Sequence, residues 1–259
     1  MATPTLIRAV EREALVFRKL WRGDVFTSFI GPVLFLSAMG LGLGRYVDDG
    51  TGAAQLDGLD YLVFVTPGLL IASVMQASAA DSLWPVMGGL KWFGSFHAMV
   101  STPLAPGDVF GGRVIWTGVR AGISALAFVV VAVALGGIVS WWGVLAIPVA
   151  ILTALAFAAP LAAYAGGVES DQSFSIIMRL GIVPLFLFSG TFFPVSQLPD
   201  AVQPLAWLSP LWHGVEPARS FTTGDIDWPI TALHLAILLG ITALGWRWGI
   251  ARFTRRLTP

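Results

Sequence analysis

The residues able to support catalysis or metal binding are few and widely separated in this chain. The three histidines, His97, His213 and His234, fall in three different segments, and none belongs to a paired His–Glu metal motif. Cysteine is absent, which excludes disulfides, zinc–thiolate sites and iron–sulfur clusters. Neither lysine follows a glycine, so a phosphate-binding loop ending in Gly-Lys-Ser or Gly-Lys-Thr is missing. The sequence therefore predicts no cofactor, no metal and no ATP site of that kind on this chain.

The charged residues near the apolar segments are the remaining candidates. Arg120 and Arg179 lie within apolar runs, where long side chains usually reach water or pair with nearby acids. Asp81 or Asp108 could pair with Arg120, and Glu169 or Asp171 could pair with Arg179. A structural role is the more expected one for both intramembrane arginines, and a place on a transport path stays open.

Composition defines the elements that must position these residues. The chain has 259 residues, of which 56% are hydrophobic and 12% charged, and its mean hydropathy is +0.79. Soluble domains carry about 25% charged residues, so this chain is expected to be an integral membrane protein. The net charge of zero and the lack of an aromatic–basic module predict no nucleic-acid partner.

Six segments contain the roughly 20 apolar residues that a transmembrane helix needs. Most lysines and arginines fall in segments that share one side with the N-terminus, whereas only Arg45 and Arg219 fall on the other. The positive-inside rule then places both termini in the cytoplasm. The predicted spans are 25–44, 61–84, 114–135, 143–165, 174–192 and 229–250.

Three further segments are not predicted to span the membrane. Residues 5–22 place apolar side chains on one helical face and basic ones on the other, which predicts an interfacial helix that anchors the chain or contacts a cytoplasmic partner. Residues 85–112 form the longest internal cytoplasmic stretch, with a helix expected between a break at Gly88-Gly89 and Pro103. That helix would expose aromatic and Met side chains to lipid or to a protein groove: Trp92, Phe93, Phe96 and Met99, with Lys91 and His97 among them.

The third such segment, residues 193–228, is external and rich in proline. Its prolines should break any continuous span into short helices that enter the outer leaflet, with tryptophans as interfacial anchors. The prolines are Pro194, Pro199, Pro204, Pro210 and Pro217, and the tryptophans are Trp207, Trp212 and Trp228. The predicted fold is thus a single all-α membrane domain over 1–259. It has six spans, an interfacial N-terminal helix, a cytoplasmic helix between spans two and three, and a proline-broken re-entrant external hairpin between spans five and six.

Two local sequence patterns resemble one family of membrane proteins. Residues 188–194 (FSGTFFP), Leu198-Pro199, residues 209–214 (SPLWHG) and Arg219 resemble the C-terminal signature of type-2 ABC-transporter permeases. His97-Ala98-Met99, Thr102-Pro103-Leu104 and Asp108-Val109 resemble the segment between that family's second and third spans. Within the family, the chain looks nearest to the nodulation-protein-J and daunorubicin-resistance exporters.

The resemblance implies partners for this chain. A family member pairs with a separate cytoplasmic ATPase, which supplies ATP and Mg²⁺ sites, and with a second permease copy, identical or not. It would reside in the bacterial cytoplasmic (inner) membrane, in contact with lipid. Residues 88–101 would be the coupling helix, and the helix over 5–22 would complete the ATPase contact. The residues expected there are Lys91, Trp92, Phe93, Phe96, His97, Met99 and Arg18.

The resemblance also implies a path for substrate between two permeases, lined partly by the second and fifth spans. Candidate lining residues are Phe174, Met178, Phe186 and Phe188. So apolar a path suits an amphiphile, such as a lipid-linked saccharide, a glycolipid or a hydrophobic drug. A proton-driven secondary carrier of hydrophobic compounds is the alternative, and it would need a buried carboxylate at mid-membrane depth. An intramembrane enzyme is a third reading, and it would need a nucleophile–base pair that the sequence does not offer.

Overall fold

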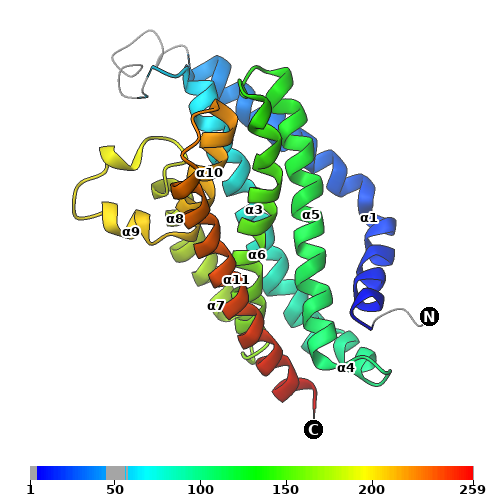
Figure 1. Cartoon of the computed structure of the whole chain (residues 1–259). Coiled ribbons are helices and arrows are strands. Elements are labelled where there is room, and N and C mark those ends of the chain that lie inside the picture. The colour runs from blue at the N-terminus through cyan, green and yellow to red at the C-terminus, as the bar shows by residue number, and fades with distance from the viewer. Residues whose placement is uncertain (1–4, 45–55, 57, 259) are drawn as a thin grey trace.

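The protein is a bundle of long helices in the computed structural model, which describes residues 5–44, 56 and 58–258 (Figure 1). No strand occurs in those residues. Four helical stretches are long and apolar enough to cross a membrane, and the apolar helices Ile30–Gly40 and Gln172–Phe188 are shorter. The all-α membrane class is confirmed, and the number of six spans stays a prediction. The four stretches are Tyr61–Trp92, Pro106–Ala134, Trp141–Ala165 and Trp228–Leu257.

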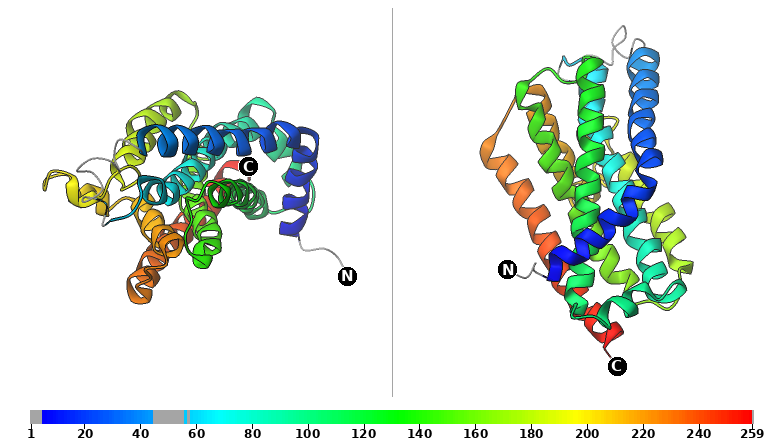
Figure 2. Two further views of the ribbon diagram at one scale, coloured as in Figure 1. Left: turned by 90° about the horizontal axis from the view of Figure 1, so that it is seen from above. Right: turned by 90° about the vertical axis from the view of Figure 1, so that its right-hand side faces the viewer.

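The first helix joins two elements that the sequence predicts as separate. Helix α1 runs without interruption over Thr5–Leu36 and continues as a π-helical stretch, Ser37–Gly44. Its N-terminal part crosses the bundle obliquely, and the chain then rises along the bundle (Figure 2). It packs mainly on α5, Pro106–Ala134. The helix is therefore continuous past residue 23, since a single Gly is tolerated within a helix, and the division into an interfacial part and a span stays a prediction. Arg45, which the charge count places outside, lies beyond the described residues.

The helix predicted on the cytoplasmic side between spans two and three is shorter than expected. Helix α3, Tyr61–Met87, passes through Gly88-Gly89 as a π-helical turn, Gly88–Trp92. The chain breaks at Gly94, whose φ of +61° favours glycine. Helix α4 then covers only Ser95–Val100. Glycine at position 89 is required because a Cβ there would lie 2.5 Å from the Phe96 ring. Below, the "α4 end" is the end of the bundle where α4 and the C-terminus lie (Figure 1).

The remaining spans differ from prediction at their ends, and side-chain hydrogen bonds cap the starts of two of them. Helix α5 starts at Pro106, where the Asp108 carboxylate accepts a hydrogen bond of 3.1 Å from the Ala105 N–H. Helix α6, Ala146–Ala165, follows a 3₁₀ turn, Trp141–Leu145. Helix α11 extends over Trp228–Leu257, and Asp227 caps it at the Ile230 N–H. The expected fifth span consists of α7, Gln172–Ile176, a π-helical turn, Ile177–Ile182, and α8, Val183–Phe188.

The proline-rich segment after α8 packs more deeply than an interfacial hairpin would. It contains a 3₁₀ turn, Val195–Gln197, and helices α9, Gln203–Trp207, and α10, Pro210–Thr223. Helix α10 packs against α3, α6 and α11, and it runs through Pro217 instead of breaking there. Most of one α10 face is buried, so this helix belongs to the core. Of the tryptophans predicted as interfacial anchors, Trp207 and Trp228 are exposed and Trp212 is half-buried, and their place at an interface stays a prediction.

Small residues let the central helices approach closely. The face of α6 inside the bundle is largely alanine, and α11 meets it at Gly245. A Cβ at position 245 would lie 2.7 Å from the Pro160 backbone N. Because that contact is with backbone, the helices would have to separate to admit any side chain.

We expect Gly245→Ala to destabilise the bundle by about 1–3 kcal/mol, because overpacking forces backbone shifts. Gly240→Ala on the same helix is the matched control, since a Cβ there meets nothing within 4 Å. The control should leave stability unchanged or raise it, because Ala favours a helix over Gly. Thermal unfolding in one detergent measures both, and equal midpoints would contradict the packing assignment.

Candidate functional site

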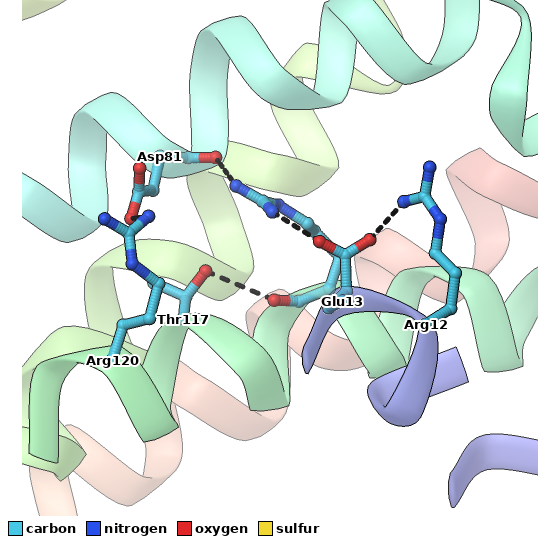
Figure 3. A network of polar contacts seen from close by, with 6 residues as sticks. Arg12, Glu13, Asp81, Thr117 and Arg120 are labelled. Atoms are coloured by element: carbon cyan, nitrogen blue, oxygen red, sulfur yellow. Dashed lines mark hydrogen bonds and ion pairs between the residues drawn. The ribbon is translucent and has the colours of Figure 1, made fainter. Parts of the chain in front are cut away.

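A buried carboxylate ties the N-terminal helix to the bundle. The Glu13 side chain on α1 is only 8% exposed, and its Oε2 accepts a hydrogen bond of 2.9 Å from Arg113 Nη1 on α5 (Figure 3). Its Oε1 accepts from the neighbouring Arg12, which is more exposed. Burial of a single carboxylate is costly unless it is paired and hydrogen-bonded. Glu13 can therefore lie inside the protein only while Arg113 stays beside it.

The same network reaches a third helix. Arg113 Nη2 donates to the Asp81 backbone oxygen on α3 at 2.8 Å, and the Asp81 carboxylate pairs with Arg120 of α5 at 2.6 Å. Of the two acids predicted for Arg120, Asp81 is the partner, while Asp108 caps α5. The network thus joins α1, α3 and α5 in one charged cluster of Arg12, Glu13, Asp81, Arg113 and Arg120, drawn in Figure 3 with Thr117.

A cavity of about 370 Å³ opens beside this charged cluster. Its walls come from α1, α3 and α5, and Phe186 of α8 closes one side. Asp81 and Arg120 lie in its lining together with Gln76 and several hydroxyl groups, and the rest of the lining is mostly apolar. A concave, largely apolar site with a few polar groups is typical of a site for small molecules or lipids.

The residues predicted for ATPase contact divide into exposed and buried ones. Trp92 and Phe93 are 52% and 82% exposed at the α4 end. Phe96 is only 2% exposed and packs against Phe253 of α11, with ring centroids 5.9 Å apart. Its assignment to a surface contact is corrected: the ring is held in the cleft that Gly89 leaves, and it anchors α4 to the bundle.

The other predicted contact residues lie on the same surface or on α1. His97 and Arg18 are exposed, and Met99 is half-buried. The Lys91 Nζ donates to the Glu169 backbone oxygen at 2.6 Å, so this ammonium also ties the end of α3 to the loop after α6. The role of the exposed residues in ATPase contact stays a prediction.

The predicted path residues on the fifth span have different environments. Phe174 is fully buried against Trp84 and Tyr164, with ring centroids 5.7 and 6.4 Å away, so it lines no open path here. Phe186 lines the cavity described above, whereas Phe188 is exposed. Met178 is half-buried and packs against the two large groups of buried apolar side chains in the bundle.

Arg179, the second arginine predicted within a span, has a different environment from Arg120. Arg179 is exposed on the π-helical turn of the fifth span. Glu169, one of the acids predicted as its partner, accepts from Arg256 of α11 instead, with Arg256 Nη2 2.9 Å from Oε2. The hydrogen bond and positive charge of Arg256 lower the pKa of Glu169 below its usual 4.5.

Two polar arrangements that join distant parts of the chain were not predicted. His213 of α10 and His234 of α11 face each other with 2.7 Å between their Nδ1 atoms, and both are buried. Arg219, assigned to the external side, pairs with Glu216 and donates to the Gly190 oxygen at 2.6 Å. No three metal-binding side chains gather anywhere in the described residues.

Comparison with known proteins identifies the class. The model of the ABC-2 type transporter family matches residues 6–222, and the chain belongs to this family of ABC-transporter membrane subunits. It is 28% identical over 251 residues to nodulation protein J of Rhizobium meliloti (strain 1021), covering 96% of this chain and 92% of the relative. It is 31% identical over 228 residues to nodulation protein J of Rhizobium leguminosarum bv. trifolii, covering 85% and 84%. It is 24% identical over 235 residues to the inner membrane transport permease YadH of Escherichia coli (strain K12), covering 88% and 86%.

We expect Glu13→Gln to destabilise the protein by about 3–5 kcal/mol, because Arg113 would remain buried without its compensating charge. Glu11→Gln is the matched control, since Glu11 is exposed on the same helix. Unfolding followed by circular dichroism in detergent measures both variants. Similar stability for the two would mean that Glu13 does not hold α1 in place.

The Glu169–Arg256 contact should be lost in acid. Because the pKa of Glu169 is lowered in the folded state, the contact stabilises above the usual pKa of 4.5 and is lost as the pH falls through the lowered value. Amide hydrogen exchange of residues 254–257 should be slower in the natural protein than in Glu169→Gln at neutral pH. At a pH well below the lowered pKa the two should exchange alike, and a difference that persists there would contradict this assignment.

Proposed function

We propose that this ABC-transporter membrane subunit is the permease of an ATP-driven exporter in the bacterial cytoplasmic membrane. It works with a separate cytoplasmic ATPase that binds ATP and Mg²⁺, and both of its termini lie in the cytoplasm. The family membership supports the pairing with an ATPase. The name of one relative, inner membrane transport permease YadH, favours a transport role.

The observation that carries the ATPase contact is the pair of exposed aromatic side chains at the α4 end. Trp92 and Phe93 end the long α3 span and precede α4, in the segment that resembles the family's coupling region. Large exposed aromatic side chains are typical anchors where one protein fits into a groove of another. Lys91, His97 and Arg18 add polar contacts around them, and Phe96 keeps α4 in position from inside.

A second permease copy is proposed for the exposed apolar face of the fifth span. Its side chains point away from the bundle, so lipid or another copy must cover them in a membrane. Two copies with six spans each would enclose a path between them, with Met178, Phe188 and Arg179 at its side. Such a path suits an amphiphilic or hydrophobic substrate, such as a lipid-linked saccharide, a glycolipid or a drug. The exposed side chains are Ile176, Leu180, Val183, Leu187 and Phe188.

The test is a pull-down and ATPase assay in lipid with a candidate ATPase subunit. We expect the double variant Trp92→Ala, Phe93→Ala to weaken the complex at least tenfold, because the complex loses two aromatic anchors that the ATPase subunit would cover. Trp141→Ala, Trp207→Ala is the matched control, since both tryptophans are exposed and lie outside the α3–α4 segment, Trp141 on the 3₁₀ turn before α6 and Trp207 on α9. The control should keep both complex and ATPase activity.

Two outcomes would contradict the proposal. The first is a normal complex with the Trp92, Phe93 double variant, which would move the ATPase contact elsewhere. The second is transport by the purified permease alone, driven by a proton gradient, which would favour a secondary carrier.

A further inference from the structure

The cavity beside α1 changes from apolar to polar along the bundle. On α3 its lining runs from Leu69 to Asp81, and on α5 from Phe128 through Arg120 to Thr117, so each helix places its charged residue toward the α4 end. On α1 the lining residues are Phe17, Gly31, Pro32 and Phe35. A lipid of the cytoplasmic leaflet has this same polarity, with its headgroup toward the α4 end and its chain toward the bilayer centre.

The length of the cavity matches one acyl chain. Leu69 and Asp81 are twelve residues apart on α3, which is about 18 Å at 1.5 Å per residue. One leaflet supplies about half of a hydrocarbon core roughly 30 Å thick. The 370 Å³ volume is also within the usual range for a small-molecule site, and it leaves no room for a folded peptide.

The cavity is open along one side. Phe35, Ser73, Ala77 and Ile123 line it and are all exposed. A two-chain lipid could therefore place one chain inside while the other remains in the bilayer.

The charged residues that line the cavity, Asp81 and Arg120, are a neutral pair, and the excess of positive charge lies in the charged cluster beside it. Three arginines and two carboxylates form the charged cluster, which leaves one net positive charge. The exposed Arg8 and Arg18 of α1 lie on the same helix as Arg12 and Glu13. Cytoplasmic leaflets are anionic, and basic groups at their surface attract anionic headgroups.

We propose that this cavity binds one anionic phospholipid of the cytoplasmic leaflet, with an acyl chain between α1, α3 and α5 and its phosphate at the Arg120 end. The bound lipid would bridge α1 to the bundle at the charged cluster. The site shares the second span and Phe186 with the substrate path predicted from the sequence, but lipid binding there needs neither the ATPase nor transport.

Native mass spectrometry of the purified, delipidated protein tests the proposal. Titration with phosphatidylglycerol should give one tightly bound lipid per chain, and phosphatidylcholine should bind at least about fivefold more weakly, because it lacks net negative charge. Ala77→Trp should abolish that lipid adduct, since the new ring would occupy the cavity. Ala236→Trp is the matched control, because Ala236 is exposed on α11 and does not line the cavity.

A charge variant tests the headgroup. Arg120→Gln should bring phosphatidylglycerol binding close to that of phosphatidylcholine, whereas Arg255→Gln, exposed near the end of α11, should keep the preference. A thermal melt without lipid shows that each variant is folded.

Three results would overturn the proposal. The first is equal binding of the two lipids to the natural protein. The second is retention of the lipid adduct in Ala77→Trp with the dimer mass also unchanged. The third is retention of the adduct in Ala77→Trp with loss of the dimer mass, which would assign the opening to a second copy. None of them depends on an ATPase, so a failed ATPase complex leaves this test intact.

Discussion

The buried carboxylate of Glu13 is the constraint on which the arrangement of the N-terminal half depends. A carboxylate at that depth needs a fixed cation, and Arg113 supplies it from α5. Arg113 in turn donates to the backbone of α3, so one ion pair sets the position of three helices. The pairing of Asp81 with Arg120, about two turns further along α5 than Arg113, closes the cluster. The position of the cavity follows from this, because α1 can approach α3 and α5 only as far as the cluster allows.

Helix α3 connects the two parts of the molecule to which we assign function. It carries Asp81 at the polar end of the cavity and Trp92 at the exposed α4 end, eleven residues or about 16 Å apart along one continuous helix. The π-helical turn at Gly88–Trp92 lies between Asp81 and the break at Gly94. Such turns often mark functional sites, because they redirect side chains without ending the helix. Here the turn carries Trp92, and the helix ends immediately after it.

The opposite end of the bundle is held together by polar side chains within an apolar setting. Arg219 of α10 lies over the Phe64 ring of α3, 4.1 Å from its centroid, and donates to the Gly190 oxygen. Gly68 of α3 is required nearby, since a Cβ there would lie 2.6 Å from the Thr191 oxygen. Buried polar groups of this kind specify one arrangement of neighbouring elements, because any other would leave them without partners. They explain why a segment rich in proline packs as part of the core.

The sequence by itself determined the protein class, the all-α fold and the family, because hydropathy, charge distribution and short motifs are local properties of the chain. It also predicted Asp81 as one of two partners for Arg120, since both lie at the same side of adjacent spans. It did not predict that Glu13 is buried, that Phe96 points inward, or that Gly88-Gly89 continue a helix. Only the tertiary structure decided these, as well as the His213–His234 contact and the cavity, because each depends on which helices touch and at what depth. Periodicity defines the faces of a helix, but not the neighbour that a given face meets.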